Sequence, residues 1–290
     1  MSEQLRVLML GAHQDDNDFL SGGIALKYIK AGHRVRFLSL TDGRGGHHEM
    51  SAEEIAERRR RETKAVEKLT GIEYDTWDER DCELVATLEN RKKLIRYIRE
   101  YNPDIIFAHR TNDYHADHRN AALLVQDASY LLIVPNFCPE APAMKKTPVI
   151  MQFYNKFKNP DFHADVAISI DDVIDEKYEM YNCHESQVYE WLPFTYGNLA
   201  DVPEDRKMRL EWLRSPRVPR DKVLTFEELS AIKKPGHHEH FEAKYAALYR
   251  TALIERYGKE GEGVIFAEVF EASPYGAPLT EEKKKILFPF

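Results

Sequence analysis

Two short clusters of imidazole and carboxylate side chains could carry chemistry in this sequence. The first, His-Gln-Asp-Asp at residues 13–16, follows the apolar run at residues 6–10. The second, Asp-Tyr-His-Ala-Asp-His at residues 113–118, follows a similar run at residues 104–108. Each cluster therefore comes directly after a predicted buried strand and before a predicted helix.

The two clusters are predicted to meet at one edge of a parallel sheet. In open parallel sheets, the loops at the carboxyl ends of the strands form the ligand crevice. We expect His13, Asp16 and His118 to converge there as metal ligands. Two imidazoles and one carboxylate leave a coordination position open, which is typical of catalytic rather than structural zinc. The residues alone therefore predict a metallohydrolase.

Three further side chains in the clusters fit roles beside a metal ion. Asp15 adjoins Asp16 and can act as the general base, because zinc lowers the pKa of a bound water to about 7. His115 can donate a hydrogen bond to a developing oxyanion. Asp117 can fix the tautomer of His115 or of a ligand histidine. The alternative is that these aspartates cap helices or line a polar loop.

The elements that must position these clusters alternate along the first half of the chain. Strands are predicted at residues 6–11, 34–41, 73–77 and 105–108. Helices are predicted between and after them, at residues 21–31, 51–69, 91–101 and 118–132. The helix at 51–69 opens on Ser51-Ala52-Glu53-Glu54, which has the pattern of a capping box. This alternation predicts an α/β fold with a doubly wound, mostly parallel sheet.

The second half of the chain is less regular. Strands are predicted at residues 149–154, 164–170 and 263–270, and helices at 172–189 and 241–257. Residues 193–219 are rich in Pro, Arg and aromatic residues and are expected to form an elaborated loop region. No repeat or linker divides the chain. We expect a single domain over residues 1–290, with a core at about 1–190 and a C-terminal elaboration at about 191–290.

Composition excludes several classes of protein. The hydrophobic content of 43% predicts a packed globular core. The formal net charge of -8 leaves no basic excess for binding a nucleic acid. The apolar runs are too short to span a membrane, and the N-terminus lacks the apolar stretch of a signal peptide. Cys82, Cys138 and Cys183 fit neither a disulfide framework nor a cysteine zinc site, so a cytoplasmic location is expected.

Together, the two clusters resemble a known family. His-x-Asp-Asp after the first strand and Asp-Tyr-His-x-Asp-His after a later one are similar to the motifs of the PIG-L/LmbE-like de-N-acetylases. Further similar segments lie at residues 39–43, 59–62, 164–166, 184–187 and 267–270. The resemblance implies a Rossmann-like sheet. It also implies an enzyme that removes acetyl groups from N-acetylglucosaminyl compounds with a divalent metal, usually zinc.

The resemblance also implies a role for individual residues. It implies that His13, Asp16 and His118 bind the metal and that Asp15 acts as the base. His115 becomes the oxyanion or acid partner, with Asp117 behind it. Arg59 is the best match to the family's sugar-contacting arginine, although the neighbouring arginines at 58, 60 and 61 leave that register open.

The sequence departs from the family pattern at positions beside the ligands. Gln14 stands where the family usually has Pro, and Ala116 replaces a second Pro. Asn17 stands where the family usually has Glu, and Asp18 can supply that charge instead. None of these changes removes a predicted ligand or the predicted base.

Histidines and aromatic residues outside the two clusters carry less weight. His47 and His48 are expected to lie in a solvated loop, and Trp191, Phe194 and Tyr196 to pack the C-terminal part. The His-His-Glu-His cluster at residues 237–240 has the wrong spacing for a two-histidine helical zinc motif.

The function expected from these observations is zinc-dependent deacetylation of a small molecule that contains N-acetylglucosamine. Fe²⁺ or another divalent ion is the alternative metal. A non-haem Fe(II) oxygenase is the first alternative function, because it uses the same set of two histidines and one carboxylate. The second is a non-catalytic sugar- or nucleotide-binding module, which would leave Asp15 without a purpose. The partner is expected to be a small amino sugar, and a homo-oligomer is compatible with the sequence.

Overall fold

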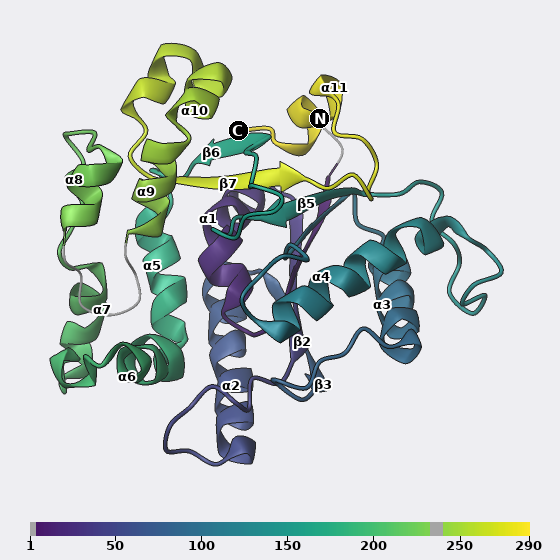
Figure 1. Ribbon diagram of the computed structural model, residues 1–290, viewed down its shortest axis with the longest axis horizontal. Helices are drawn as coiled ribbons and strands as arrows, with labels where there is room; N and C mark the ends of the chain where they lie inside the picture. The colour runs from purple at the N-terminus through teal and green to yellow at the C-terminus, as the bar shows by residue number, and fades with distance from the viewer. Residues whose placement is uncertain (1–3, 233–239) are drawn as a thin grey trace.

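A seven-stranded sheet forms the centre of the computed structural model, which describes residues 4–232 and 240–290 (Figure 1). The strands are, in chain order, β1 (Arg6–Gly11), β2 (Arg34–Thr41), β3 (Glu73–Glu79), β4 (Ile105–Ala108), β5 (Val149–Phe153), β6 (Val166–Ser169) and β7 (Ala267–Ala272). Their order across the sheet is β3-β2-β1-β4-β5-β7-β6. The first five strands are parallel, and β7 runs antiparallel to β5 and β6. The predicted doubly wound, mostly parallel sheet is confirmed.

Helices cover both faces of this sheet. Those that follow the early strands are α1 (Asp16–Lys30), α2 (Ala52–Thr70), α3 (Leu88–Tyr101) and α4 (Ala116–Ser129), and α5 (Ile174–Cys183) follows β6. Residues of α1, α2 and α5 join one hydrophobic cluster, and residues of α3 and α4 join the other. In Figure 1, α3 and α4 accordingly lie apart from α1, α2 and α5.

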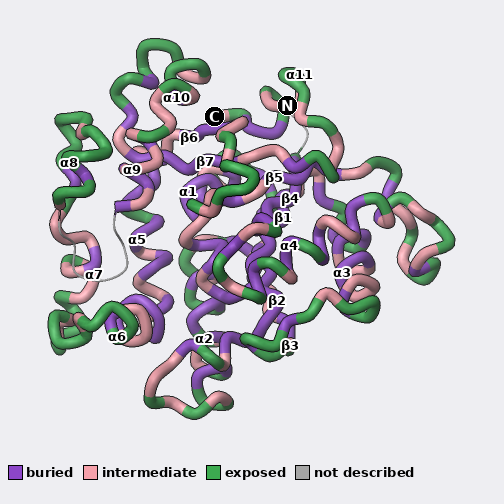
Figure 2. The backbone as a smooth tube through the Cα atoms, in the orientation of Figure 1, coloured by how far each residue is buried: buried purple, intermediate pink, exposed green. Residues whose placement is uncertain are grey.

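The central strand β1 shows why both faces must be covered. Val7 and Met9 point into the cluster with α1, whereas Leu8 and Leu10 point into the cluster with α3 and α4. All four side chains are fully buried, because successive residues of a strand face opposite sides of the sheet. The middle of the molecule is accordingly buried in Figure 2, and exposed segments lie at its periphery.

The chain changes direction across the sheet between β1 and β4. β2 and β3 lie on one side of β1, and β4 lies on its other side. The chain therefore leaves β1 and β4 in opposite directions across the sheet. In open α/β sheets, a crevice opens between the loops that follow two such strands, and ligands bind there. Both predicted clusters of functional residues lie in these two loops and in the first turns of the helices that follow them.

The region expected to be a loop at residues 193–219 contains helices, so that expectation is wrong. A π-helical turn (Gln187–Trp191) leads into α6 (Leu192–Tyr196), and α7 (Arg206–Arg214) and α8 (Phe226–Ala231) follow. Asp205 caps α7 by accepting a hydrogen bond from the Lys207 N–H, and Thr225 begins α8 with a capping box. Such local caps stabilise short helices in a stretch without clear apolar periodicity.

The predicted helix at residues 241–257 is interrupted. It forms α9 (Phe241–Leu248) and α10 (Arg250–Tyr257), which are separated at Tyr249. A short helix, α11 (Glu281–Leu287), follows β7. Of the predicted cluster at residues 237–240, residues 237–239 lie outside the described residues. Among the helices that the structure describes, none is both long enough and apolar enough to cross a bilayer.

Candidate active site

The turn after β1 places the first cluster directly at the sheet edge. Helix α1 begins at Asp16, only five residues after Gly11 ends the strand. A Cβ atom added to Gly11 would lie 2.8 Å from Cβ of Asp16 and 3.1 Å from the carbonyl oxygen of His13. Glycine is therefore required for this close return of the chain. The turn brings the His13 N–H to Asp16 Oδ2 at 2.7 Å, which orients the carboxylate.

The three predicted metal ligands meet at this edge. His118 Nε2 lies 3.3 Å from His13 Nδ1 and 3.3 Å from Asp16 Oδ1. His13 Nδ1 lies 3.4 Å from Asp16 Oδ2. A tetrahedral ion with ligands at about 2.0–2.1 Å spaces its ligand atoms about 3.3–3.4 Å apart. The donor set and its spacing therefore fit a zinc-like divalent ion.

Carboxylates lie next to the other nitrogen of each predicted ligand histidine. Asp113 Oδ1 lies 3.0 Å from His118 Nδ1, and Asp81 Oδ1 lies 3.0 Å from His13 Nε2. Such partners fix the tautomer of a metal-binding imidazole and raise its basicity. Burial alone would lower the pKa of His118, but the neighbouring Asp16 and Asp113 raise it to about 9. Neither Asp81 nor Asp113 received a role from the sequence, although both lie in loops at the carboxyl end of the sheet.

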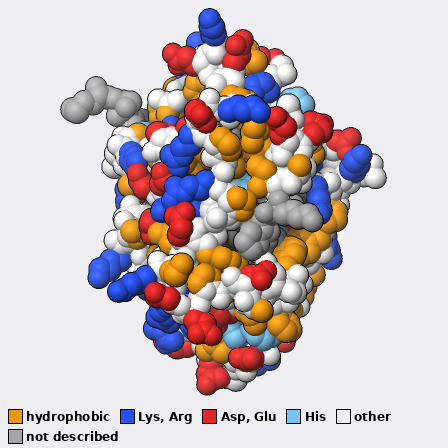
Figure 3. Space-filling view, turned by 90° about the vertical axis from the view of Figure 1, so that its left-hand side faces the viewer, with side chains coloured by type: hydrophobic (Ala, Val, Ile, Leu, Met, Phe, Trp, Pro, Cys, Tyr) orange, Lys and Arg blue, Asp and Glu red, His pale blue; other side chains and the backbone are white. Residues whose placement is uncertain are grey.

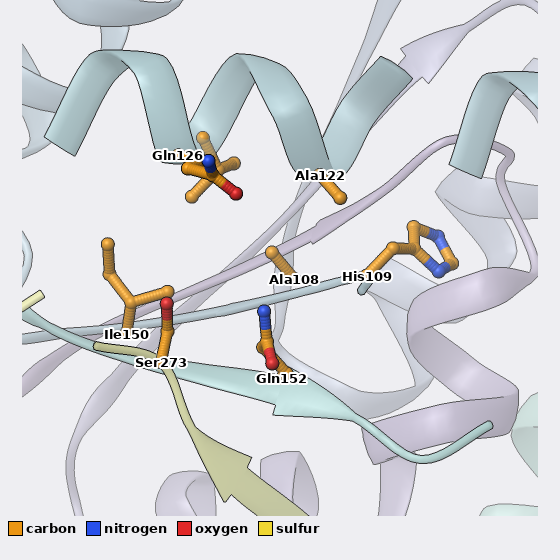
Figure 4. A pocket seen from close by; sticks show the side chains of 8 residues that line it. Ala108, His109, Ala122, Gln126, Ile150, Gln152 and Ser273 are labelled. Atoms are coloured by element: carbon orange, nitrogen blue, oxygen red, sulfur yellow. The ribbon is translucent and has the colours of Figure 1, made fainter. Parts of the chain in front are cut away.

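His109 is a further residue of the site that the sequence did not indicate. It is the first residue after β4, and its Nε2 lies 3.1 Å from Asp16 Oδ2. Its ring stacks on that of His118, with ring centroids 4.0 Å apart. In Figure 4 it lies at one end of a cavity of about 10 Å³ between α4 and the sheet, which Gln126, Gln152 and Ser273 also line. That volume is about the size of one water molecule.

Asp15 and Arg59 form an ion pair beside the ligands. Arg59 Nη2 donates to Asp15 Oδ1, and Nη1 lies 3.5 Å from the carbonyl oxygen of Gly43. Arg59 is only 2% exposed, so it lies behind Asp15 rather than on an open surface. Its neighbours point elsewhere, since Arg58 pairs with Glu190 and Arg60 pairs with Asp78. The arginine that reaches the site is therefore the predicted one, and its contact there is Asp15.

His115 lies at the N-cap of α4 and faces the ligands edge-on. Its ring centroid is 4.6 Å from that of His13. Its Nδ1 accepts a hydrogen bond from the Asp117 N–H at 3.1 Å. In the neutral ring the proton must then sit on Nε2, which becomes the donor. Burial lowers the pKa of His115, and the nearby His13 and His118 lower it further.

The carboxylate of Asp117 lies against a predicted ligand histidine, His13, which is one of the two partners expected from the sequence. Its Oδ2 lies 3.4 Å from His13 Nε2 and accepts the Cys82 N–H at 2.7 Å, while Oδ1 accepts the Leu84 N–H at 3.2 Å. Asp117 therefore touches His115 through its backbone and His13, a predicted ligand, through its carboxylate. It also ties the loop after β3 to the site.

The residues that depart from the family pattern lie beneath the site. Asn17 donates to the carbonyl oxygen of Leu38 at 3.2 Å. Asp18 is fully buried, and its Oδ2 accepts the Tyr74 hydroxyl at 3.0 Å and lies 3.2 Å from His184 Nε2. Burial raises the pKa of Asp18, and His184 opposes that rise. The Asp18 carboxylate thus contacts Tyr74 and His184 in the interior instead of the predicted ligands.

A row of stacked rings lies near the start of α2. His47 stacks on His48, and His48 stacks on Phe194 of α6 with ring centroids 4.1 Å apart. His47 Nε2 also lies 2.9 Å from Glu190 Oε2. The side chains of His47 and His48 are only 4% and 11% exposed, so the expectation of a solvated histidine pair is wrong. Phe194 remains 48% exposed. Hydrophobic and His side chains also gather at the lower end of the face in Figure 3, the end at which α6 lies.

Comparisons with known proteins agree with this arrangement. Residues 8–129, which contain both clusters, match the family model described as GlcNAc-PI de-N-acetylase (PIG-L). The chain is also 32% identical over 203 residues to a diacetylchitobiose deacetylase of Thermococcus kodakarensis, covering 65% of this chain and 74% of that protein. The chain belongs to the PIG-L family of deacetylases. The family that the motifs resemble is thereby confirmed.

Solved structures of low sequence identity show the same fold. The N,N'-diacetylchitobiose deacetylase of Pyrococcus horikoshii superposes with a TM-score of 0.64 at 23% identity, covering 94% of this chain and 85% of that chain. GalB, the 4-carboxy-2-hydroxymuconate hydratase of Pseudomonas putida, superposes with a TM-score of 0.68 at 16% identity, covering 96% and 99%. Because a deacetylase and a hydratase share this fold, the reaction has to be argued from the site. None of the three proteins named here is an oxygenase.

Proposed function

We propose that this protein is a metal-dependent hydrolase that removes the N-acetyl group from a small molecule containing N-acetylglucosamine and releases acetate. The observation that carries the proposal is the triangle of His13, Asp16 and His118, with Asp15 and His115 beside it. The substrate class follows from the family and from its diacetylchitobiose deacetylase member. Zinc is the metal we propose, because two imidazoles and one carboxylate suit it.

His13, Asp16 and His118 would hold the metal. A bound divalent ion supplies a Lewis acid for the acetamide carbonyl and lowers the pKa of water at the site. The chain itself prepares the ligands, because Asp81 and Asp113 orient the two imidazoles. These residues make the metal site rigid before substrate arrives.

Asp15 is the proposed general base. Its carboxylate is next to Asp16 in sequence, it is bound by Arg59 and its side chain is 13% exposed, so it is not one of the three proposed ligands. Arg59 holds one of its oxygens, which fixes the direction of the other. Asp15 takes a proton from the attacking water and later returns a proton to the leaving amine. The contact of Arg59 with the sugar stays a prediction, and we propose that Arg59 also positions Asp15.

His115 is the proposed donor to the developing oxyanion. The Asp117 N–H occupies its Nδ1, so its Nε2–H is free to donate. A donor that is already oriented stabilises the negative charge of the transition state without reorganisation. Asp117 supports this geometry through its backbone and supports His13 through its carboxylate.

Release of acetate from a panel of N-acetylated amino sugars tests the proposal. The protein would be stripped with a chelator, reloaded with Zn²⁺ and assayed without dioxygen against N-acetylglucosamine, its disaccharide and its glycosides. We expect acetate in equal amount to the free amine, only after the metal is restored. A requirement for Fe²⁺ and dioxygen would favour the oxygenase, and tight sugar binding without acetate would favour the binding module.

A further inference from the structure

A second group of potential metal ligands lies beside the proposed centre. One ligand atom each from Asp81, Cys82 and His115 lie within 4.8 Å of one another. Asp81 and Cys82 are in the loop after β3, and His115 is at the N-cap of α4. Neither the three proposed metal ligands nor Asp15 belongs to this group, and the proposed reaction gives Cys82 no part.

The backbone holds the Cys82 thiol in place. Cys82 has φ of 70°, a left-handed conformation that is uncommon for any residue except glycine. Its N–H donates to Asp117 Oδ2 at 2.7 Å, which fixes this turn against the site. Its Sγ lies 3.4 Å from Asp81 Oδ1. The left-handed backbone conformation and the hydrogen bond to Asp117 therefore hold the thiol next to the Asp81 carboxylate.

The segment facing Cys82 leaves room for the thiol. A Cβ atom added to Gly45 would lie 3.2 Å from Cys82 Sγ and 3.1 Å from Asp81 Oδ2. The Gly45 N–H also donates to Asp81 Oδ2 at 3.0 Å, which directs Oδ1 of the same carboxylate toward Cys82 and His13. Because Gly45 has no side chain, the Asp81 carboxylate and the Cys82 sulfur can both pack closely against its backbone. Cys82 as a whole is exposed, so an ion can reach it from solvent.

The donor set selects the class of ion. The His115 Nδ1 is occupied by the Asp117 N–H, so Nε2 is the nitrogen available to a ligand. One sulfur, one imidazole nitrogen and one carboxylate oxygen favour Zn²⁺ or Cd²⁺, whereas Mg²⁺ and Ca²⁺ favour oxygen ligands alone.

We propose that Asp81, Cys82 and His115 bind a second, thiophilic divalent cation, and that this cation inhibits the enzyme. The inhibition rests on the proposed function, whereas the binding does not. A cation on His115 Nε2 would take away the proposed oxyanion donor. It would also draw Asp81 Oδ1 away from His13 Nε2, which lies 3.0 Å from it. Coordination would release the thiol proton to solvent.

Cadmium titration of the zinc-loaded protein tests the site. We expect a second equivalent to bind with the ultraviolet charge-transfer band of a cadmium–thiolate bond, together with loss of deacetylase activity that a mild chelator reverses. Cadmium that exchanges into the first site would give no such band, because His13, Asp16 and His118 offer no sulfur. The band therefore reports on the second site alone.

Cys82→Ser is the decisive variant, and Cys183→Ser is its matched control. Loss of an outer partner alone costs about 10–100-fold in metal affinity, so loss of the sulfur should weaken the second equivalent by at least about 100-fold. The Cys82→Ser protein should lack the band and keep its activity in cadmium, while Cys183→Ser should behave as wild type. Cys82→Gly suits the positive φ and provides a second test should Ser disturb the turn.

Two results would overturn this inference. One is a wild-type protein that takes up a single equivalent with no thiolate band. The other is a Cys82→Ser protein that keeps both the second equivalent and the inhibition. Failure of the proposed function would look different, since the band and the stoichiometry would persist in a protein that releases no acetate.

Discussion

Asp15 is the residue on which the proposed mechanism depends most. Asp15→Asn keeps the shape of the side chain and its contact with Arg59 but removes the proton acceptor. General base catalysis contributes about 10²–10⁴-fold, so kcat should fall by roughly that factor. Metal analysis of the same preparation should still find one ion per chain.

His13→Ala is the control for that variant, because it removes a proposed ligand and should lose the ion itself. Release of the metal by Asp15→Asn would make Asp15 a ligand. Full activity with the metal retained would instead exclude a carboxylate as the base of this reaction.

Asp113 tests whether the outer carboxylates prepare the metal site. It lies 3.0 Å from His118 Nδ1 and also accepts the His115 N–H. Asp113→Asn should weaken metal binding by about 10–100-fold, as measured by competition with a chelating dye. Asp78→Asn is the control, because Asp78 is exposed and pairs only with Arg60 among the ion pairs described. Equal metal affinity in both variants would mean that Asp113 does not orient His118.

Site residues could be predicted from the sequence where they are closely spaced along the chain. His13, Asp16 and His118 could be predicted because each lies in a dense cluster behind a buried strand, and the structure brings them together. Asp81 and His109 could not be predicted in this way. Asp81 is one of several charged residues at 78–83 without a neighbouring histidine, and His109 directly follows β4, outside the dense cluster at 113–118. Only the fold shows that both lie next to the proposed ligands. The position of Asp81 just past the end of β3 could have suggested a place at the site. That position indicates little unless the order of the strands in the sheet is known.

At the scale of elements, α3 holds the chain between α4 and β5 through one side chain. Arg99 is 5% exposed and donates to six carbonyl oxygens of residues 131–141. Arg99→Met would leave those acceptors unpaired, and two of them belong to buried residues and four to half-buried ones. Each acceptor that water cannot reach would cost about 1–3 kcal/mol. We expect a loss of about 3 kcal/mol or more in the free energy of unfolding, measured by urea denaturation.

Arg96→Met on the same helix is the matched control. Arg96 pairs with Glu140 at the surface, where both side chains are about half exposed, and such a pair contributes about 0–1 kcal/mol. A similar loss in the two variants would contradict the role assigned to Arg99.

Elements were predictable where periodicity and caps agreed. Helix α2 was expected from its capping box, and the structure shows both of its reciprocal hydrogen bonds. Helices α6 and α7 were missed because they have only 5 and 9 residues and bury one residue each, Pro193 and Leu213. A helix with so little buried surface leaves almost no apolar pattern in the sequence.

At the scale of the molecule, the last strand could not be placed from the sequence. β7 inserts antiparallel between β5 and β6, and its Glu268 accepts the N–H groups of Gly23 and Ile24 in α1. These contacts join residues about 245 positions apart, and no local pattern encodes such a pairing. The parallel half could be predicted, because right-handed strand–helix–strand units follow from the order of their elements.

The proposed metal would connect the two halves of this sheet edge. Of its proposed ligands, His13 lies in the loop after β1, Asp16 begins α1, and His118 lies in α4, which follows β4. β1 and β4 are the neighbouring strands at which the strand order reverses. An ion that binds only the folded state stabilises it by about 2.7 kcal/mol when its free concentration is 100 times its Kd. Removing it with a chelator should therefore lower the Tm by roughly 5 °C for a chain of this size. His13→Ala should show a low Tm that the chelator does not change, and an unchanged Tm in the wild type would mean that no ion joins β1 to α4.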